Sequence, residues 1–96
     1  MMVPVSAKIL LFATLRKKYG AKSLTVKCDG SVRNLIENAS KILGSRFLDD
    51  LFDKGHNKIR GDIIFMINGR NIKDLKGKIE IKDGDEIAIF PPLAGG

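Results

Sequence analysis

The stretch from Ser31 to Gly44 constrains the fold more than any other part of this sequence. Its apolar residues recur at the spacing of a helix with one buried face, at Val32, Leu35, Ile36, Ala39, Ile42 and Leu43. Ser31 is a favourable N-cap residue, and Gly44 stands where a helix would end. The spacing therefore predicts one amphipathic helix over residues 32–43.

Strand patterns flank this helix on both sides. "AKILLFATL" is a continuous apolar run and "SLTVKC" alternates, so with the polar turn "RKKYGAK" between them they predict a β-hairpin. Later, "DIIFMI" predicts a strand, "NGR" a tight hairpin turn, "NIKDL" a short return strand, "KIEIKDGD" a turn region and "EIAIF" the last strand. Between them, Phe47, Leu48, Leu51 and Phe52 suggest a short helix that caps the core.

This order of elements favours an α+β fold with a sheet of about five strands and one main helix on one face. The first, third and last strands carry apolar residues in both phases, but a single helix covers only one face. We therefore expect part of the other face to be exposed and to bind a partner.

The chain has 96 residues, which predicts one domain. We expect a flexible leader at residues 1–6, the domain at 7–90 and an extended tail at 91–96. No apolar run is long enough to span a bilayer, and Cys28 is the single cysteine, so a cytoplasmic protein without membrane association is expected. The formal charge of +6 favours acidic partners or a solvated lysine-rich surface, and it does not separate the two.

The sequence closes on "FPPLAGG". Pro91 and Pro92 end the last strand because they lack backbone donors, and they stiffen the root of the tail. Gly95 and Gly96 have no Cβ, so this tail is able to thread a narrow channel and approach another molecule closely. The pattern points to the terminal carboxylate as the reactive group.

Three segments carry a family resemblance: "KILLFATLRKKYG", "INGRNI" and "LKGKIEIKDGDEIAIFPPLAGG". They resemble the MoaD/ThiS family of ubiquitin-like sulfur carriers, and within it the small subunits of molybdopterin synthase. The resemblance covers Ala7 to Gly96 and is weakest over Ser45 to Gly61. It implies a β-grasp fold with strand order two-one-five-three-four around one helix.

The resemblance also implies a chemistry in which the chain is a co-substrate and not an enzyme. A ubiquitin-activating-type adenylating enzyme would join the Gly96 carboxylate to AMP, and sulfur from a persulfide enzyme would displace the AMP to leave a thiocarboxylate. The tail, with Leu93 and Ala94 between the prolines and the glycines, would then enter the large subunit of molybdopterin synthase. There it would give up its sulfur in molybdenum or tungsten cofactor biosynthesis. No permanently bound cofactor or metal is expected.

The partner surface is predicted from the phase of the first strand. Lys8 shares a phase with Leu10 and Phe12, and because a lysine in the core is unfavourable, this phase should face away from the helix. The resemblance makes the first and last strands neighbours, so Phe12 and Phe90 would form one apolar patch at the root of the tail. It also favours a partner contact for Arg16, although the run "RKK" by itself is typical of a solvated surface.

Other residues receive simpler interpretations. Cys28 is in phase with Leu24 and Val26, which predicts a buried thiol, and His56 lacks companions at metal-ligand spacing. "KDGDE" lacks the oxygen ladder of a calcium loop. Two alternatives stay open beside the sulfur carrier for molybdopterin synthesis. One is a ubiquitin-like carrier for tRNA thiolation or protein conjugation, and the other is a small basic nucleic-acid-binding domain, disfavoured because aromatic residues do not interleave with the basic ones.

Overall fold

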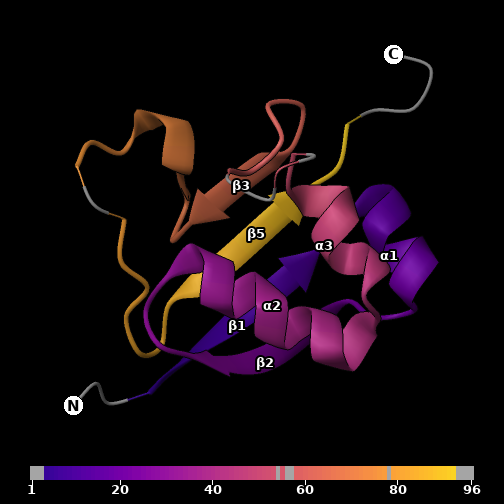
Figure 1. Ribbon diagram of the computed structural model, residues 1–96, viewed down its shortest axis with the longest axis horizontal. Helices are drawn as coiled ribbons and strands as arrows, with labels where there is room; N and C mark the ends of the chain where they lie inside the picture. Colours follow the sequence, from indigo (N-terminus) through magenta and orange to yellow (C-terminus); the bar gives the residue numbers. More distant parts are fainter. Residues whose placement is uncertain (1–3, 54, 56–57, 78, 93–96) are drawn as a thin grey trace.

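The computed structural model describes residues 4–53, 55, 58–77 and 79–92, and a single mixed sheet runs through them (Figure 1). The strands of this sheet are β1 (Val5–Leu11), β2 (Ser23–Cys28), β3 (Ile64–Ile67), β4 (Arg70–Asn71) and β5 (Glu86–Phe90). Their order across the sheet is β2-β1-β5-β3-β4. β1 and β5 are parallel, and the other neighbouring pairs are antiparallel. The α+β class and the strand order expected from the sequence are confirmed.

The helical elements of the described chain are α1 (Ala13–Tyr19), α2 (Val32–Leu43), α3 (Arg46–Leu51) and the 3-10 helix η1 (Ile72–Asp74). In Figure 1, α2 crosses one face of the sheet in front of β1 and β2. α1 and α3 lie beside one another at the end of the sheet where β1 and β5 finish. None of the described helices is long and apolar enough to cross a membrane.

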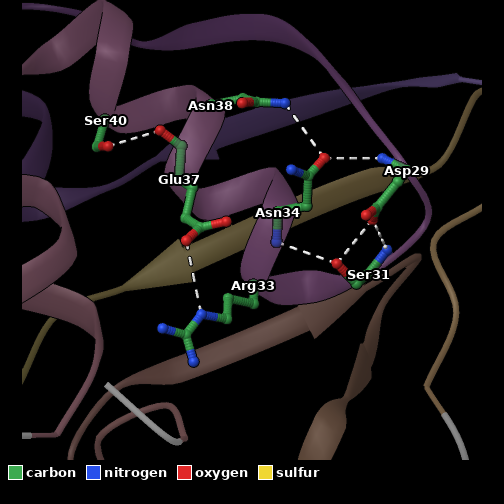
Figure 2. A network of polar contacts seen from close by, with 7 residues as sticks. All are labelled: Asp29, Ser31, Arg33, Asn34, Glu37, Asn38 and Ser40. Atoms are coloured by element: carbon green, nitrogen blue, oxygen red, sulfur yellow. Dashed lines mark hydrogen bonds and ion pairs between the residues drawn. The ribbon is translucent and has the colours of Figure 1, made fainter. Parts of the chain in front are cut away.

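Side-chain caps fix the start of α2, as Figure 2 shows. The Ser31 hydroxyl oxygen accepts a hydrogen bond from the Asn34 backbone N–H at 3.1 Å, which satisfies one of the free donors of the first turn. Asp29 Oδ1 accepts from both the backbone N–H and the hydroxyl of Ser31, at 2.9 and 2.7 Å. Further along, Asn38 Nδ2 donates to the Lys27 carbonyl at 2.8 Å and ties the helix to β2. The predicted helix and its N-cap are confirmed.

The hydrophobic core lies between the sheet and the helices. Ile9 and Leu11 of β1 and Ile87 and Ile89 of β5 are all 0% exposed, as predicted for the phase under the helix. α2 adds Leu35, Ile36 and Ala39, and α3 adds Phe47 and Leu51. The predicted short helix over 47–52 is therefore present and caps the core.

The connection between β1 and β2 differs from the prediction. The segment expected to be the end of a strand and a polar turn folds into α1, which ends at Gly20 with φ of 66°. Leu15 is buried and Tyr19, one turn later, packs against the core, so two apolar anchors are enough to hold a short helix of good helix formers. β1 and β2 are antiparallel neighbours, but they do not form a tight hairpin.

Three smaller expectations are also revised. "NIKDL" contributes only Asn71 to β4, because the Asn71 side chain accepts from the Lys73 N–H at 2.9 Å and starts η1. Ile42, counted with the apolar stripe of α2, is 63% exposed because it lies at the margin of that stripe in the last turn. β1 begins at Val5, inside the segment expected to be a flexible leader.

The predicted turn at "NGR" is confirmed. Asn68 and Gly69 have φ of 50° and 83°, the left-handed values that a two-residue hairpin loop of this kind requires. Met66 pairs with Asn71 and Ile67 pairs with Arg70 across the hairpin.

Candidate functional site

Two aromatic rings meet where the last strand ends. Phe12 follows β1 and Phe90 closes β5, and their rings stack with centroids 4.3 Å apart and planes 13° from parallel. The chain turns sharply after Phe12, because Ala13 takes φ of 52°, a left-handed value that is unusual for a residue with a side chain. Both rings are half-buried. The predicted patch of Phe12 and Phe90 is therefore formed at the root of the tail.

Arg16 lies beside this ring pair. Its guanidinium carbon is 5.4 Å from the centre of the Phe12 ring, and its Nε donates to the Leu11 carbonyl at 3.1 Å. The hydrogen bond and the cation–π contact hold the guanidinium beside the patch while Arg16 as a whole stays exposed. A planar charged group held in this way is suited to bind a carboxylate of another molecule.

The sheet register places further residues on the same open face. Leu10 of β1 is opposite Ala88 of β5, which in turn is opposite Met66 of β3. Phe90 is opposite Ile64, whose side chain is 47% exposed. The open-face patch comprises Leu10, Phe12, Ile64, Met66, Ala88 and Phe90. The sequence had not indicated which residues of β3 join it, because that strand is apolar in both phases.

Charged residues border this patch at the opposite end of the strands. Lys8 of β1 is opposite both Glu86 of β5 and Thr25 of β2, and all three are exposed. The assignment of the Lys8 phase to the uncovered face is therefore confirmed. An apolar centre with a polar margin is the usual anatomy of a protein–protein interface.

A second surface lies beside the same root, on the helix side of the sheet. Pro91 and Pro92 line a groove of about 280 Å³ together with residues of α1, α3 and the loop before β3, namely Thr14, Leu15, Lys18, Asp50, Arg60 and Ile63. No sequence pattern had indicated this groove. Its walls come from segments distant in the chain, and part of it lies in the stretch where the family resemblance is weakest.

Polar contacts join α1 to α3 at this groove. The Tyr19 hydroxyl donates to Asp50 Oδ2, and Lys18 Nζ lies 2.9 Å from the same oxygen. The Tyr19 ring also meets Phe47 edge-on at 5.3 Å. Burial and the hydrogen bond to Asp50 raise the pKa of the Tyr19 phenol well above its ordinary value. This Tyr19–Asp50–Lys18 clasp holds the two short helices together behind the tail.

The turn before β5 has a structural role and not a metal-binding one. Asp83 Oδ1 accepts from the Ser6 N–H at 2.8 Å. The carboxylate of Asp85 accepts from the Lys82 N–H at 2.8 Å and from Asn68 Nδ2 at 2.9 Å. These bonds fasten the turn to β1 and to the β3–β4 hairpin. Among the residues that the structure describes, no group of acidic, cysteine or histidine side chains is arranged to hold a metal ion.

The remaining predicted site residues fall into two groups. Leu93, Ala94, Gly95 and Gly96 lie outside the described residues, as does His56. Cys28 is only 3% exposed, and burial raises the pKa of its thiol, so the prediction of a buried cysteine is confirmed.

The fold and this site define a ubiquitin-like β-grasp protein that presents an apolar face at the root of its C-terminal segment. The sequence matches the ThiS family over residues 9–96. The chain therefore belongs to the ThiS family of small ubiquitin-like sulfur carriers, which are not catalysts themselves.

Relatives within this group carry different names. The molybdopterin synthase sulfur carrier subunit of Drosophila melanogaster is 40% identical over 65 residues, covering 67% of this chain and 72% of the relative. The solution structure of small archaeal modifier protein 1 from Methanosarcina acetivorans superposes with a TM-score of 0.79 at 31% identity, covering 98% of this chain and 99% of that one. CysO in the BexX/CysO complex of Amycolatopsis orientalis gives a TM-score of 0.78 at 25% identity, covering 94% and 99%.

Proposed function

We propose that this protein carries sulfur as a C-terminal thiocarboxylate and donates it in molybdopterin biosynthesis, as the small subunit of molybdopterin synthase. Family membership supports the carrier role, and the relative from Drosophila melanogaster supports the pathway. The structural observation that carries the proposal is the stacked pair of Phe12 and Phe90. It gives a partner an apolar surface to hold directly beside the segment that would react.

The proposed reaction begins at the carboxylate of Gly96. A carboxylate is a poor acyl donor until one of its oxygens is part of a good leaving group. In the proposal, a separate adenylating enzyme joins it to AMP from ATP with release of pyrophosphate. A persulfide sulfur then attacks the carbonyl carbon and AMP leaves. The chain itself supplies the acyl group and its presentation, and no described side chain is needed for bond-making.

The surface at the root supports this division of labour. The open-face patch would dock on the partner, and the Arg16 guanidinium would bind a carboxylate at its edge. Pro91 is half-buried and Pro92 is exposed, and a proline pair limits the conformational freedom that the tail loses on entering a partner. A carrier of this kind needs one surface that serves several enzymes in turn, with the reactive end placed at a constant distance from it.

A second candidate function is conjugation to protein amines or sulfur donation to tRNA. The similarity to small archaeal modifier protein 1 over nearly the whole chain favours it. Both functions begin with the same adenylation, so they differ only in the acceptor of the activated glycine.

The experiment that tests the carrier function is intact-mass spectrometry. The protein is incubated with its cognate adenylating enzyme, ATP and a persulfide donor. Replacement of one oxygen by sulfur in the product is expected, and it should be absent when ATP is omitted. Adding the large subunit of molybdopterin synthase and a cyclic pterin phosphate should then return the mass to its original value. Return of the mass only with tRNA, or a protein–protein adduct in place of the thiocarboxylate, would favour the second candidate.

A further inference from the structure

A larger groove lies at the end of the sheet away from the tail. It has a volume of about 620 Å³ and lies between the β3–β4 hairpin and the segment that leads into β5. Its apolar floor is formed by Ile67, Leu75 and Ile79. Ile67 is almost buried, whereas Leu75 and Ile79 are only partly covered. The floor is therefore accessible to apolar groups of another molecule.

The rim of this groove is basic. Arg70, Lys76 and Lys82 line it and are exposed, and none of the three makes an ion pair with another described residue. Two acidic residues also line it, Glu80 and Asp85. The Asp85 carboxylate already accepts two hydrogen bonds within the protein, whereas Glu80 is exposed. Three cations against two carboxylates leave the described lining with an excess of positive charge.

The groove is separated from the tail-root surface. In the pairing of β3 with β5, Ile64 lies opposite Phe90 while Ile67 lies opposite Ile87, so the Ile67 end of β3 is far from the root of the tail. Ile67 also belongs to the helix-covered phase, whereas the open-face patch lies on the other side of the sheet. In Figure 1 the segment leading into β5 lies at the left, and β5 runs away from it toward the right. A molecule in this groove leaves the tail free.

We propose that this groove docks an acidic, extended peptide segment of a partner protein. Carboxylates on such a segment would pair with the basic rim, and apolar side chains between them would cover the floor. An extended chain presents successive side chains to opposite sides, which matches a groove that has an apolar bottom and charged margins. A small inorganic anion would leave the floor exposed, whereas a cavity of this size is large enough for several side chains.

This interaction would tether the carrier without using its reactive end. A partner bound at the groove would keep the protein nearby while the tail moves between enzymes, and the local concentration of the tail would rise accordingly. The proposal is independent of the sulfur chemistry, because its test measures peptide binding alone. A failure here leaves the proposed function intact, and the reverse also holds.

The test is a fluorescence-anisotropy titration with a labelled peptide of alternating aspartate and leucine. A peptide with lysine in place of aspartate serves as its control. The groove variant carries Arg70→Gln, Lys76→Gln and Lys82→Gln. We expect it to bind the acidic peptide at least about tenfold more weakly than the natural protein, which corresponds to about 1.4 kcal/mol.

A matched variant separates the groove from net charge. Lys17→Gln, Lys22→Gln and Lys41→Gln remove the same charge from exposed positions that do not line the groove. This variant should bind within about twofold of the natural protein, since diffuse charge contributes little to a specific contact at physiological salt. Equal weakening by both variants would overturn the proposal, and so would a failure of the acidic peptide to bind the natural protein.

The location of binding is read from backbone amide shifts in a nuclear magnetic resonance titration with the same peptide. Shifts at Ile67, Leu75 and Ile79 are expected. Shifts centred on Phe12 and Phe90 would place the peptide on the tail-root surface and overturn the proposal. Displacement of the peptide by ATP at the groove, with tighter binding of ATP than of the peptide, would also overturn it, because the groove would then be a nucleotide site.

Discussion

The ring of Phe90, the last residue of β5, lies nearly parallel to the ring of Phe12, which follows β1, at a centroid distance of 4.3 Å. β1 and β5 are parallel neighbours, so both strands finish at the same edge of the sheet and deliver these two rings together. The next residue after this pair is Pro91. A partner that holds the rings therefore holds the base of the segment that we propose to react.

Charge placed in this ring pair should disrupt partner binding. We expect Phe12→Glu or Phe90→Glu to weaken binding to the large subunit of molybdopterin synthase by about 2 kcal/mol or more, as for a hot-spot residue. The melting temperature should change much less, because both rings are only half-buried. Isothermal titration calorimetry and thermal melts measure the two effects. Thr25→Glu, on the same face but away from the rings, is the matched control. A double variant that binds normally and melts early would contradict this prediction.

The position of the terminal carboxylate should be critical. Deleting Gly96, or adding one residue after it, should leave the fold intact and abolish adenylation, because the reacting group would no longer reach the nucleotide in the correct geometry. ATP–pyrophosphate exchange with the cognate adenylating enzyme measures this step, and circular dichroism checks the fold. Undiminished exchange by the shortened protein would exclude the carrier function.

Cys28 should matter for stability and not for sulfur transfer. It is almost fully buried, and its raised pKa keeps the thiol protonated at neutral pH, so alkylation of the folded protein should require a higher pH than for an ordinary thiol. We expect Cys28→Ala to lower the free energy of unfolding by about 1 kcal/mol. Thiocarboxylate formation by this variant should be unchanged in the intact-mass assay. Loss of sulfur loading in a variant that is still folded would make Cys28 a participant.

The Tyr19–Asp50–Lys18 clasp should make stability depend on alkaline pH. The folded-state pKa of Tyr19 lies above the ordinary value of 10.0, so the folded protein holds this proton more tightly than the unfolded chain does. The Tyr19 contribution is therefore complete below the ordinary phenol pKa and declines as pH rises above it. Tyr19→Phe should cost about 1 kcal/mol at neutral pH, from the lost hydrogen bond. Its denaturant-measured stability should then fall less steeply with alkaline pH than that of the natural protein. Parallel pH curves for the two proteins would refute the assignment.

The basic charge should not confer specific nucleic-acid binding. We expect only weak, sequence-independent retention that falls steeply as the salt concentration rises. Gel-shift titrations with single-stranded and double-stranded oligonucleotides, at low and at physiological salt, measure this. A tight, sequence-dependent shift at physiological salt would revive the nucleic-acid-binding hypothesis.

Local patterns were sufficient for several parts of this fold. The apolar spacing and the cap at Ser31 predicted α2, and the Asn68-Gly69 pair predicted the hairpin turn, because each depends only on residues within a few positions. One charged residue, Lys8, was enough to orient β1, since strand side chains alternate and a lysine is rarely buried. Where local patterns were ambiguous, the predictions made from them failed. A polar segment with only two apolar anchors, Leu15 and Tyr19, carried no clear signal for α1.

The assembled structure decided the features that depend on distant pairs. β3 is apolar in both phases, and only its register against β5 places Ile64 on the open face and Phe65 in the core. The groove behind the tail joins Lys18, Asp50 and Pro91 from three separate segments. The basic groove at the far end likewise exists only because the segment before β5 folds back beside the β3–β4 hairpin. Periodicity tells which residues of an element share a face, but contact between elements depends on pairing and packing across the whole chain, which no local pattern encodes.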